Sequence, residues 1–272
     1  MKGRRLFFCV SAVLLLGLPA AATRFAQRFF SDNTGYEPQT PNTPYDGKFT
    51  FARIKYTVGP GGYYYRGLPS WAHGYVPDAG RRSSRAEINL MKILKEVSYL
   101  NPHVEETNVF RLDDPNLFKY PVAYMTEAGY WEMSDKEAAA LRAYLKKGGF
   151  MIFDDFRSDF RGGGGWGQFE SNMRRVLPEG RFVAMDPTMA IFDSFFKIES
   201  FNVIPQSYDQ AKPDILGLFE DNDPTKRLMV IANHNTDIAD FWEFSATGFR
   251  PIDESNEAYK LGVNYIMYGM TH

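Results

Sequence analysis

Residues 144–157 read YLKKGGFMIFDDFR, and this stretch decides the fold. Gly148 and Gly149 end a predicted helix, because glycine terminates helices readily. The apolar letters FMIF that follow predict a buried strand. Asp154 and Asp155 come directly after that strand. In an open α/β sheet, ligands bind beyond the carboxyl ends of the strands, so both acids are candidate catalytic residues.

The first 22 residues have the pattern of a secretory leader. Three basic residues precede an apolar run that ends at Leu18, and small residues follow at 20–22. The run is short for a membrane span, which needs roughly 20 apolar residues. We therefore expect residues 1–22 to be a signal peptide, with an uncleaved membrane anchor as the alternative. Both alternatives predict an exported protein, periplasmic or extracellular. The protein would contact a membrane only if the leader stays uncleaved.

Composition narrows the classes of partner and of chemistry. The chain has 31 Lys and Arg against 33 Asp and Glu, and loss of the leader removes three cations and no acids. A mature net charge of about −5, without a basic block, argues against nucleic acid as a partner. The single cysteine, Cys9, lies within the leader. We therefore expect no disulfide, no thiolate metal site and no thiol nucleophile in the mature protein.

Alternating strands and helices predict a single α/β domain at residues 48–272. Residues 23–47 are polar and contain several prolines, so we expect a flexible arm or linker there. Strands in turn with helices favour a mainly parallel sheet covered on both faces, which is a three-layer sandwich. The predicted strands are 49–58, 107–112, 121–125, 150–153, 182–185, 196–198 and 227–232, and the predicted helices are about 84–100, 134–147, 166–176 and 255–270.

A second polar segment, Asn233–Asp240, follows the late strand of the prediction. His234 is a candidate general base, and Asp237 is a candidate for fixing its tautomer. Alternatively, these two residues and the aspartates after the earlier strand would bind a divalent cation, although the spacing matches no known metal motif. Hydrogen bonding to loop backbone is the remaining alternative for all of them. Adjacent strand residues point opposite ways, so Asp154 and Asp155 are not expected to share a proton.

Other residues near predicted strand ends are candidates for ligand binding. The aromatic ones would stack on a sugar ring or a peptide, with core packing as the alternative. His73 lies in the loop rich in glycine and aromatic residues that follows the first predicted strand, as Tyr64 and Trp71 do. It is a further candidate for lining the ligand cleft at the strand ends. The glycine run 162–165 matches neither the P-loop pattern nor the GxGxxG pattern of phosphate-binding loops. It is more typical of a mobile flap. The candidate ligand-binding residues are Glu127, Tyr130, Trp131, Arg157, Asn235, Tyr64 and Trp71.

Four phrases together resemble one family: YMTEAGYWEMSDKEAAALRAYLKKGGFMIFDDFR, IFDSFFKI, RLMVIANHNTDIADFWE and AYKLGVNYIMYGMTH. They are similar to the bacterial domain-of-unknown-function family 4159, over about residues 49–272. The resemblance implies a flavodoxin-like fold similar to that of class I glutamine amidotransferases. Those enzymes have a cysteine nucleophile after one strand, where this chain has Asp154 and Asp155, and a histidine and an acid after a later strand, where this chain has His234 and Asp237. Because the cysteine is absent, glutaminase activity by a thioester route is excluded.

Three functions are consistent with these observations. The first is the binding of a small polar ligand, such as a carbohydrate or a cell-wall fragment, at the strand ends. The second is a metal-assisted hydrolase, in which His234 or an acid activates water. The third is a scaffold that contacts envelope proteins through the arm and exposed aromatic residues. No cofactor is implied beyond the divalent cation of the second hypothesis.

Overall fold

The structure is a computed structural model that describes residues 41–63, 67–75, 84–157, 165–202 and 212–272. The predicted signal peptide and most of the predicted arm, at 23–40, lie outside these residues. Within the described part of the chain, no helix combines the length and the apolar character needed to cross a membrane.

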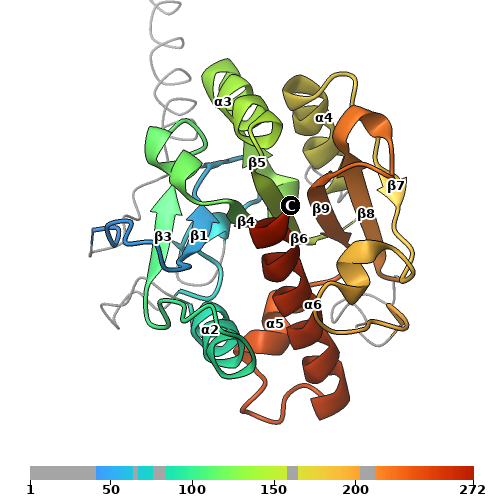
Figure 1. The fold of residues 1–272 in the computed structure, drawn as a ribbon. Helices are drawn as coiled ribbons and strands as arrows, with labels where there is room; N and C mark the ends of the chain where they lie inside the picture. The colour runs from blue at the N-terminus through green and yellow to red at the C-terminus, as the bar shows by residue number, and fades with distance from the viewer. Residues whose placement is uncertain (1–40, 64–66, 76–83, 158–164, 203–211) are drawn as a thin grey trace, which may run out of the picture.

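A seven-stranded sheet forms the centre of the domain (Figure 1). Its strands are β1 (Phe51–Ile54), β3 (Thr107–Phe110), β4 (Val122–Thr126), β6 (Phe150–Phe156), β7 (Val183–Ala184), β8 (Asp214–Phe219) and β9 (Leu228–His234). The order is β3-β1-β4-β6-β9-β8-β7, and the first five strands run parallel while β8 and β7 join antiparallel. A second, two-stranded sheet pairs β2 (Thr57–Val58) with β5 (Trp131–Glu132).

Helices cover both faces of the large sheet (Figure 1). On one face lie α3 (Asp135–Lys146) and α4 (Trp166–Val176), and on the other lie α2 (Arg85–Val97), α5 (Ile238–Glu243) and α6 (Ile252–Thr271). Successive side chains of β6 point to opposite faces of the sheet and so contribute to the hydrophobic core on each face. Phe150 and Ile152 pack with α6, whereas Met151 and Phe153 pack with α3 and α4. The predicted three-layer α/β sandwich is therefore confirmed. Short 3-10 helices occur at Ser70–Ala72 (η2), Pro115–Lys119 (η4), Ala128–Tyr130 (η5), Ala190–Asp193 (η6) and Glu220–Asn222 (η7).

The helix α3 begins where the sequence predicts, at a capping box. The Ser134 hydroxyl accepts the N–H of Glu137, and the Glu137 carboxylate accepts the N–H of Ser134 at 2.9 Å. The two side chains thus satisfy backbone groups that a helix start leaves unpaired. The helix ends before Gly148, whose φ of 108° suits glycine and few other residues. These local signals fix the length of α3 and deliver the chain to β6.

Several elements differ from the predictions. The predicted strand 49–58 divides into β1 and β2. The predicted strand at 196–198 is wrong. The Asn264 side chain forms hydrogen bonds with both the N–H and the carbonyl of Phe196, at 2.7 Å each, so these groups do not pair with a neighbouring strand. The sequence predicts neither β8, which glycine interrupts at Gly217, nor α5, which at six residues is too short to show a helical period.

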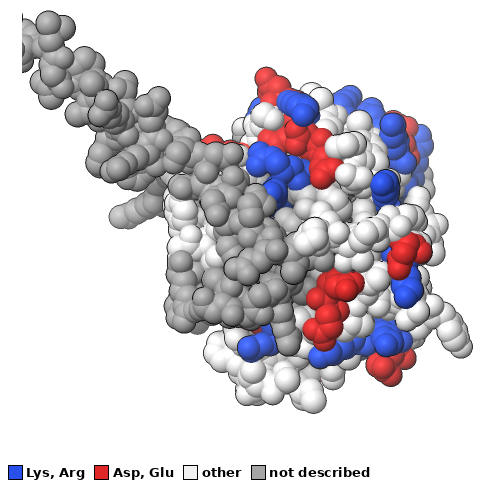
Figure 2. Space-filling view, turned by 90° about the vertical axis from the view of Figure 1, so that its left-hand side faces the viewer, with Lys and Arg blue, Asp and Glu red and all other residues white. Residues whose placement is uncertain are grey.

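Residues 42 and 43, at the end of the predicted arm, lie against the outer strand β3. The Asn42 amide donates to the Val109 carbonyl and accepts from the Val109 N–H, both at 2.9 Å. The Asn108 amide in turn binds the N–H and carbonyl of Thr43 at 2.8 and 3.0 Å. These pairs replace the hydrogen bonds of a further strand, so this part of the sheet edge is covered. Figure 2 shows the side of the molecule that lies left in Figure 1, and Lys and Arg are intermixed with Asp and Glu on its described surface.

Three neighbouring parallel strands end in residues with a left-handed backbone. The φ angles are 54° at Glu127 after β4, 54° at Asp155 in β6 and 56° at Asn235 after β9. Residues other than glycine rarely adopt this backbone conformation, and where they do, the position is often part of a functional site. The register between β6 and β9 also shifts between Phe153 and Phe156, so Asp155 lies at an irregularity of the ladder.

Candidate metal centre

His73 lies at the centre of the candidate site. It follows η2, and its Nδ1 is 2.7 Å from Oδ2 of Asp155. Oε1 of Glu127 is 3.6 Å from the same nitrogen. His73 and Asp155 are buried, and the Glu127 side chain keeps about a fifth of its surface exposed. The loop after η2 therefore meets the ends of β4 and β6 at the carboxyl edge of the sheet.

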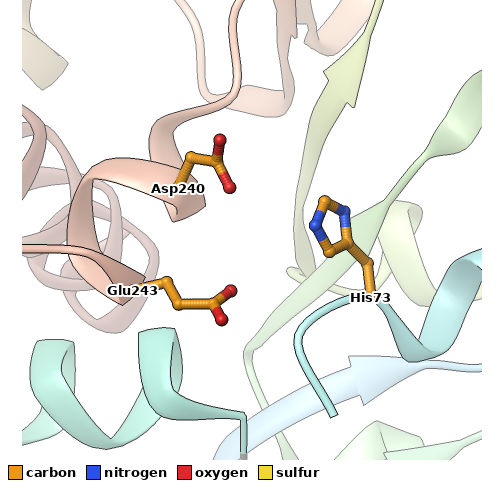
Figure 3. A group of neighbouring side chains, drawn as sticks. All are labelled: His73, Asp240 and Glu243. Atoms are coloured by element: carbon orange, nitrogen blue, oxygen red, sulfur yellow. The ribbon is translucent and has the colours of Figure 1, made fainter. Parts of the chain in front are cut away.

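The other side of His73 faces α5. Asp240 and Glu243 are three positions apart and lie on one face of this helix. Their carboxylates and one ring nitrogen of His73 all lie within 4.8 Å of one another. Figure 3 shows the imidazole directing a ring nitrogen toward both carboxylates. Because Nδ1 is bonded to Asp155, the nitrogen that faces α5 is Nε2.

Two of the predicted aspartates hold the start of α5. Oδ1 of Asp237 accepts the N–H of Asp240 at 3.0 Å and so caps the helix. Asp154 accepts two further amide N–H groups of the first turn, at 3.3 and 3.1 Å, and the hydroxyl of Tyr124 at 2.8 Å. A carboxylate is stabilised at the positive end of a helix dipole. Asp154 therefore fixes α5 against β6.

Asp237 also belongs to a second group of close ligand atoms. One oxygen of Asp237, one of Asp155 and a ring nitrogen of His73 lie within 4.8 Å of one another. Asp237 is only 2% exposed, and its Oδ2 has no hydrogen-bond partner among the described residues. A buried carboxylate oxygen without a partner is costly, so binding a proton or a cation there would be favourable.

Burial raises the pKa of most acids in the cluster. For Asp237 and Glu127 burial is the main cause and the charge of Asp155 the second, and both pKa values lie well above the usual range. Burial also raises the pKa of Asp154 to about 7, and it raises the pKa values of both acids on α5. Burial opposes the charging of His73, but the hydrogen bond and charge of Asp155 raise its pKa to about 9. Shifts of this kind are typical of functional sites.

His234 lies apart from both groups of ligand atoms. Its neighbour Asn233 faces α6, where Oδ1 accepts the hydroxyl of Tyr265 at 2.9 Å. Alternation along β9 turns His234 to the opposite face, where its ring packs on Phe156 and Trp166 with centroids 5.5 and 5.1 Å apart. There it lines a groove of about 840 Å³ beside α4. The structure thus brings Asp155 and Asp237 to His73, and not to His234.

The candidate aromatic residues have different surroundings. Trp71 and Trp131 are 0% exposed and present no ring face to a ligand, so core packing describes both. Tyr130 is the last residue of η5 and is half-buried. Tyr64 lies outside the described residues.

The last two candidates, Arg157 and Asn235, lie at the ends of β6 and β9. The Arg157 carbonyl accepts the N–H of Trp166 at 3.0 Å, which joins β6 to α4. The Asn235 N–H donates to the Phe156 carbonyl at 2.9 Å, and Asn235 lines a further groove of about 630 Å³. Both residues therefore border the carboxyl edge of the sheet outside the two ligand groups.

Sequence reasoning did not single out Asp240 and Glu243 as site residues. Asp240 ends the polar segment 233–240, and the spacing of Glu243 from it is an available signal, because acids three positions apart share a helix face. That signal depends on recognising α5, which is too short for a periodic pattern.

The family comparison covers the whole candidate site. A family model described as "Domain of unknown function (DUF4159)" matches residues 50–270. No curated protein matches the chain. The observed α/β sandwich is compatible with the resemblance to class I glutamine amidotransferases. Since the match includes most of the chain, this protein belongs to the DUF4159 family.

Proposed function

We propose that this protein binds a divalent metal cation through Nε2 of His73 and the carboxylates of Asp240 and Glu243. One observation carries the proposal: the ligand atoms of these three residues lie within 4.8 Å of one another. A cation between them would attract both carboxylates, in addition to the ion pair that Asp240 forms with Arg250 at 2.9 Å. Such attraction is large where burial limits screening by water.

Asp155 would act on the cation through His73. Metal-binding histidines commonly donate their second ring N–H to a carboxylate, which fixes the orientation and tautomer of the ring. The distance of 2.7 Å between Nδ1 of His73 and Oδ2 of Asp155 supports this role. The oxygen of Asp237 without a hydrogen-bond partner adds negative charge close to the same imidazole.

The ligand set narrows the choice of cation and of reaction. One imidazole nitrogen and two carboxylates suit Zn²⁺, Mn²⁺ or Fe²⁺ better than Ca²⁺ or Mg²⁺, which prefer oxygen ligands alone. Three protein ligands leave coordination positions for water, and a metal-bound water is a nucleophile at neutral pH. Hydrolysis is the reaction class that we propose.

Titration calorimetry on protein freed of metal by a chelator tests the proposal. We expect Zn²⁺ or Mn²⁺ to bind with a stoichiometry of one, and Mg²⁺ and Ca²⁺ to bind more weakly. Because the cation would bind only the folded state, it should also raise the melting temperature.

Two double variants make the test specific to the site. Asp240→Asn/Glu243→Gln removes two carboxylate charges with little change of shape, and we expect it to weaken Zn²⁺ binding roughly 100-fold or more. Asp253→Asn/Glu254→Gln removes two charges from the first turn of α6 and should bind as the wild type does. Equal affinities of the two variants, or no binding to the wild type, would contradict the proposal.

A second candidate function is the binding of a small polar ligand such as a carbohydrate. The groove of about 840 Å³ beside α4 favours it, because Trp166 contributes an aromatic ring and Arg174, Asp214 and His234 contribute polar groups. A melting-temperature screen against cell-wall and storage saccharides tests this function. A saturable rise that Arg174→Ala abolishes would support it, and the absence of a shift with every saccharide would count against it.

A further inference from the structure

We propose that Arg53 is a positioning residue that holds the loop of His73 in the place required for cation binding. This inference rests on the proposed function. Arg53 lies in β1 and is 2% exposed, which is unusual for a guanidinium. Its link to His73 is through the backbone, so its effect on the cation would be indirect.

The guanidinium binds two carbonyl groups of the loop. Nη1 donates to the carbonyl oxygens of Trp71 and His73 at 2.9 and 2.8 Å. The other backbone group of His73, its N–H, donates to the carbonyl of Ser70 at 3.0 Å. Both backbone groups of His73 are therefore hydrogen-bonded. These bonds fix the position of its backbone, and so the attachment point of its imidazole, relative to β1.

The guanidinium is itself held by α2 and β3. Its Nε forms an ion pair with Glu87, and Oε2 of Glu87 accepts the N–H of Ser84 at 2.9 Å and the hydroxyl of Thr107 at 2.7 Å. The ring of Tyr75 lies 4.9 Å from the centre of the guanidinium. With these contacts Arg53 has a fixed orientation, and it transmits that orientation to the loop.

Stability alone does not account for this arrangement. The net contribution of a buried ion pair is small, because desolvation of both charges offsets their attraction. An apolar pair of similar volume would fill the same space. The planar guanidinium supplies directed donors for the carbonyls of Trp71 and His73 as well. A metal ligand has to be held to within about 0.5 Å, and these donors provide such a constraint from β1, a strand paired on both sides.

The double variant Arg53→Met/Glu87→Gln tests this role. It removes both charges together, so that no unpaired charge stays buried. The new glutamine preserves the capping box of α2, because glutamine also serves at that position. Arg227→Met is the matched control: Arg227 likewise donates to two backbone carbonyls, those of Leu145 and Gly149, but at the amino edge of the sheet.

Calorimetry with Zn²⁺ and the absorption spectrum of the Co²⁺-loaded protein are the first readouts. We expect the double variant to unfold cooperatively, to bind Zn²⁺ about 10- to 100-fold more weakly and to give a changed Co²⁺ spectrum. Arg227→Met should match the wild type in affinity and spectrum. Wild-type affinity together with an unchanged spectrum in the double variant would overturn the role of Arg53.

Side-chain NMR of the metal-free protein separates this inference from the cation site. The ring signals of His73, identified by their absence in His73→Gln, should shift in the double variant and stay unchanged in Arg227→Met. If the wild type binds no cation but the signals shift, the cation site fails and the positioning role stands. Unshifted signals would overturn the positioning role. Should the double variant not fold, Arg53→Lys replaces it with the same expectations, because it retains the charge beside Glu87 without the planar fork.

Discussion

Nδ1 of His73 lies 2.7 Å from Oδ2 of Asp155, although the two residues are 82 positions apart in the chain. The contact joins the loop after η2 to the end of β6. It also determines which nitrogen of the imidazole faces α5, and hence which atoms would bind a cation.

Asp155→Asn should weaken Zn²⁺ binding by about 10- to 100-fold. The substitution keeps the shape of the side chain but removes the charge that orients His73 and strengthens it as a ligand. Calorimetry measures the affinity, and Asp186→Asn, on an exposed loop, serves as the control. An affinity equal to that of the control would show that Asp155 does not support a cation ligand.

His234→Gln should leave the affinity for Zn²⁺ unchanged. Its ring packs on Phe156 and Trp166 on the sheet face opposite α5, so it has no direct route to the proposed cation. His73→Gln, by contrast, should weaken binding roughly tenfold or more. Parallel calorimetry on the two variants checks the difference. Loss of binding in His234→Gln alone would reverse the assignment of the histidine ligand.

The stability of the metal-free protein should fall as the pH rises from about 4 to about 9. Asp154 has a pKa of about 7 in the folded protein against 3.8 ordinarily, so between these values the folded state binds more protons and is favoured at the acidic end. His73, at about 9 against 6.5, contributes stability that is complete below 6.5 and lost as the pH rises through 9. The urea midpoint should therefore be lower at about pH 8 than at about pH 5. A midpoint that is equal or higher at the alkaline pH would refute these shifts.

Asn108→Ala should destabilise the fold by about 1–3 kcal/mol. The buried amide of Asn108 binds the backbone of Thr43 and the hydroxyl of Tyr120, and alanine would leave these partners without it. Urea unfolding measures the change, with the exposed Asn116→Ala as the control. If both variants lose the same small amount, residue 43 does not hold the edge of β3.

The elements predicted correctly are those with local signals. The strand β6 begins as an apolar run after two glycines, although it continues through Asp154 and Asp155 to Phe156 and does not end before them as predicted. The helix α3 begins at a capping box within four residues. The strand β8 lacks such a signal, since Gly217 interrupts its pattern and its partner β9 lies later in the chain. The segment 196–198 carries a strand pattern, but a distant side chain, that of Asn264, takes its hydrogen bonds. Local propensity cannot reveal such long-range competition.

The candidate site was predictable only in part, for the same reason. The rule that ligands bind at the carboxyl ends of strands pointed to Asp155 and Asp237, which do lie at this edge. The rule does not tell which face of the sheet a residue selects, and His234 lies on the face away from Asp155 and Asp237. His73 reaches Asp155 from a loop far away in sequence, so only the fold joins them.

The most direct measurement is an anomalous difference map from crystals of the protein grown with Zn²⁺ or Mn²⁺. We predict a single peak within about 2.0–2.2 Å of Nε2 of His73 and of carboxylate oxygens of Asp240 and Glu243. A map without a peak there, or with the cation on the Nδ1 side between Asp155 and Asp237, would contradict it.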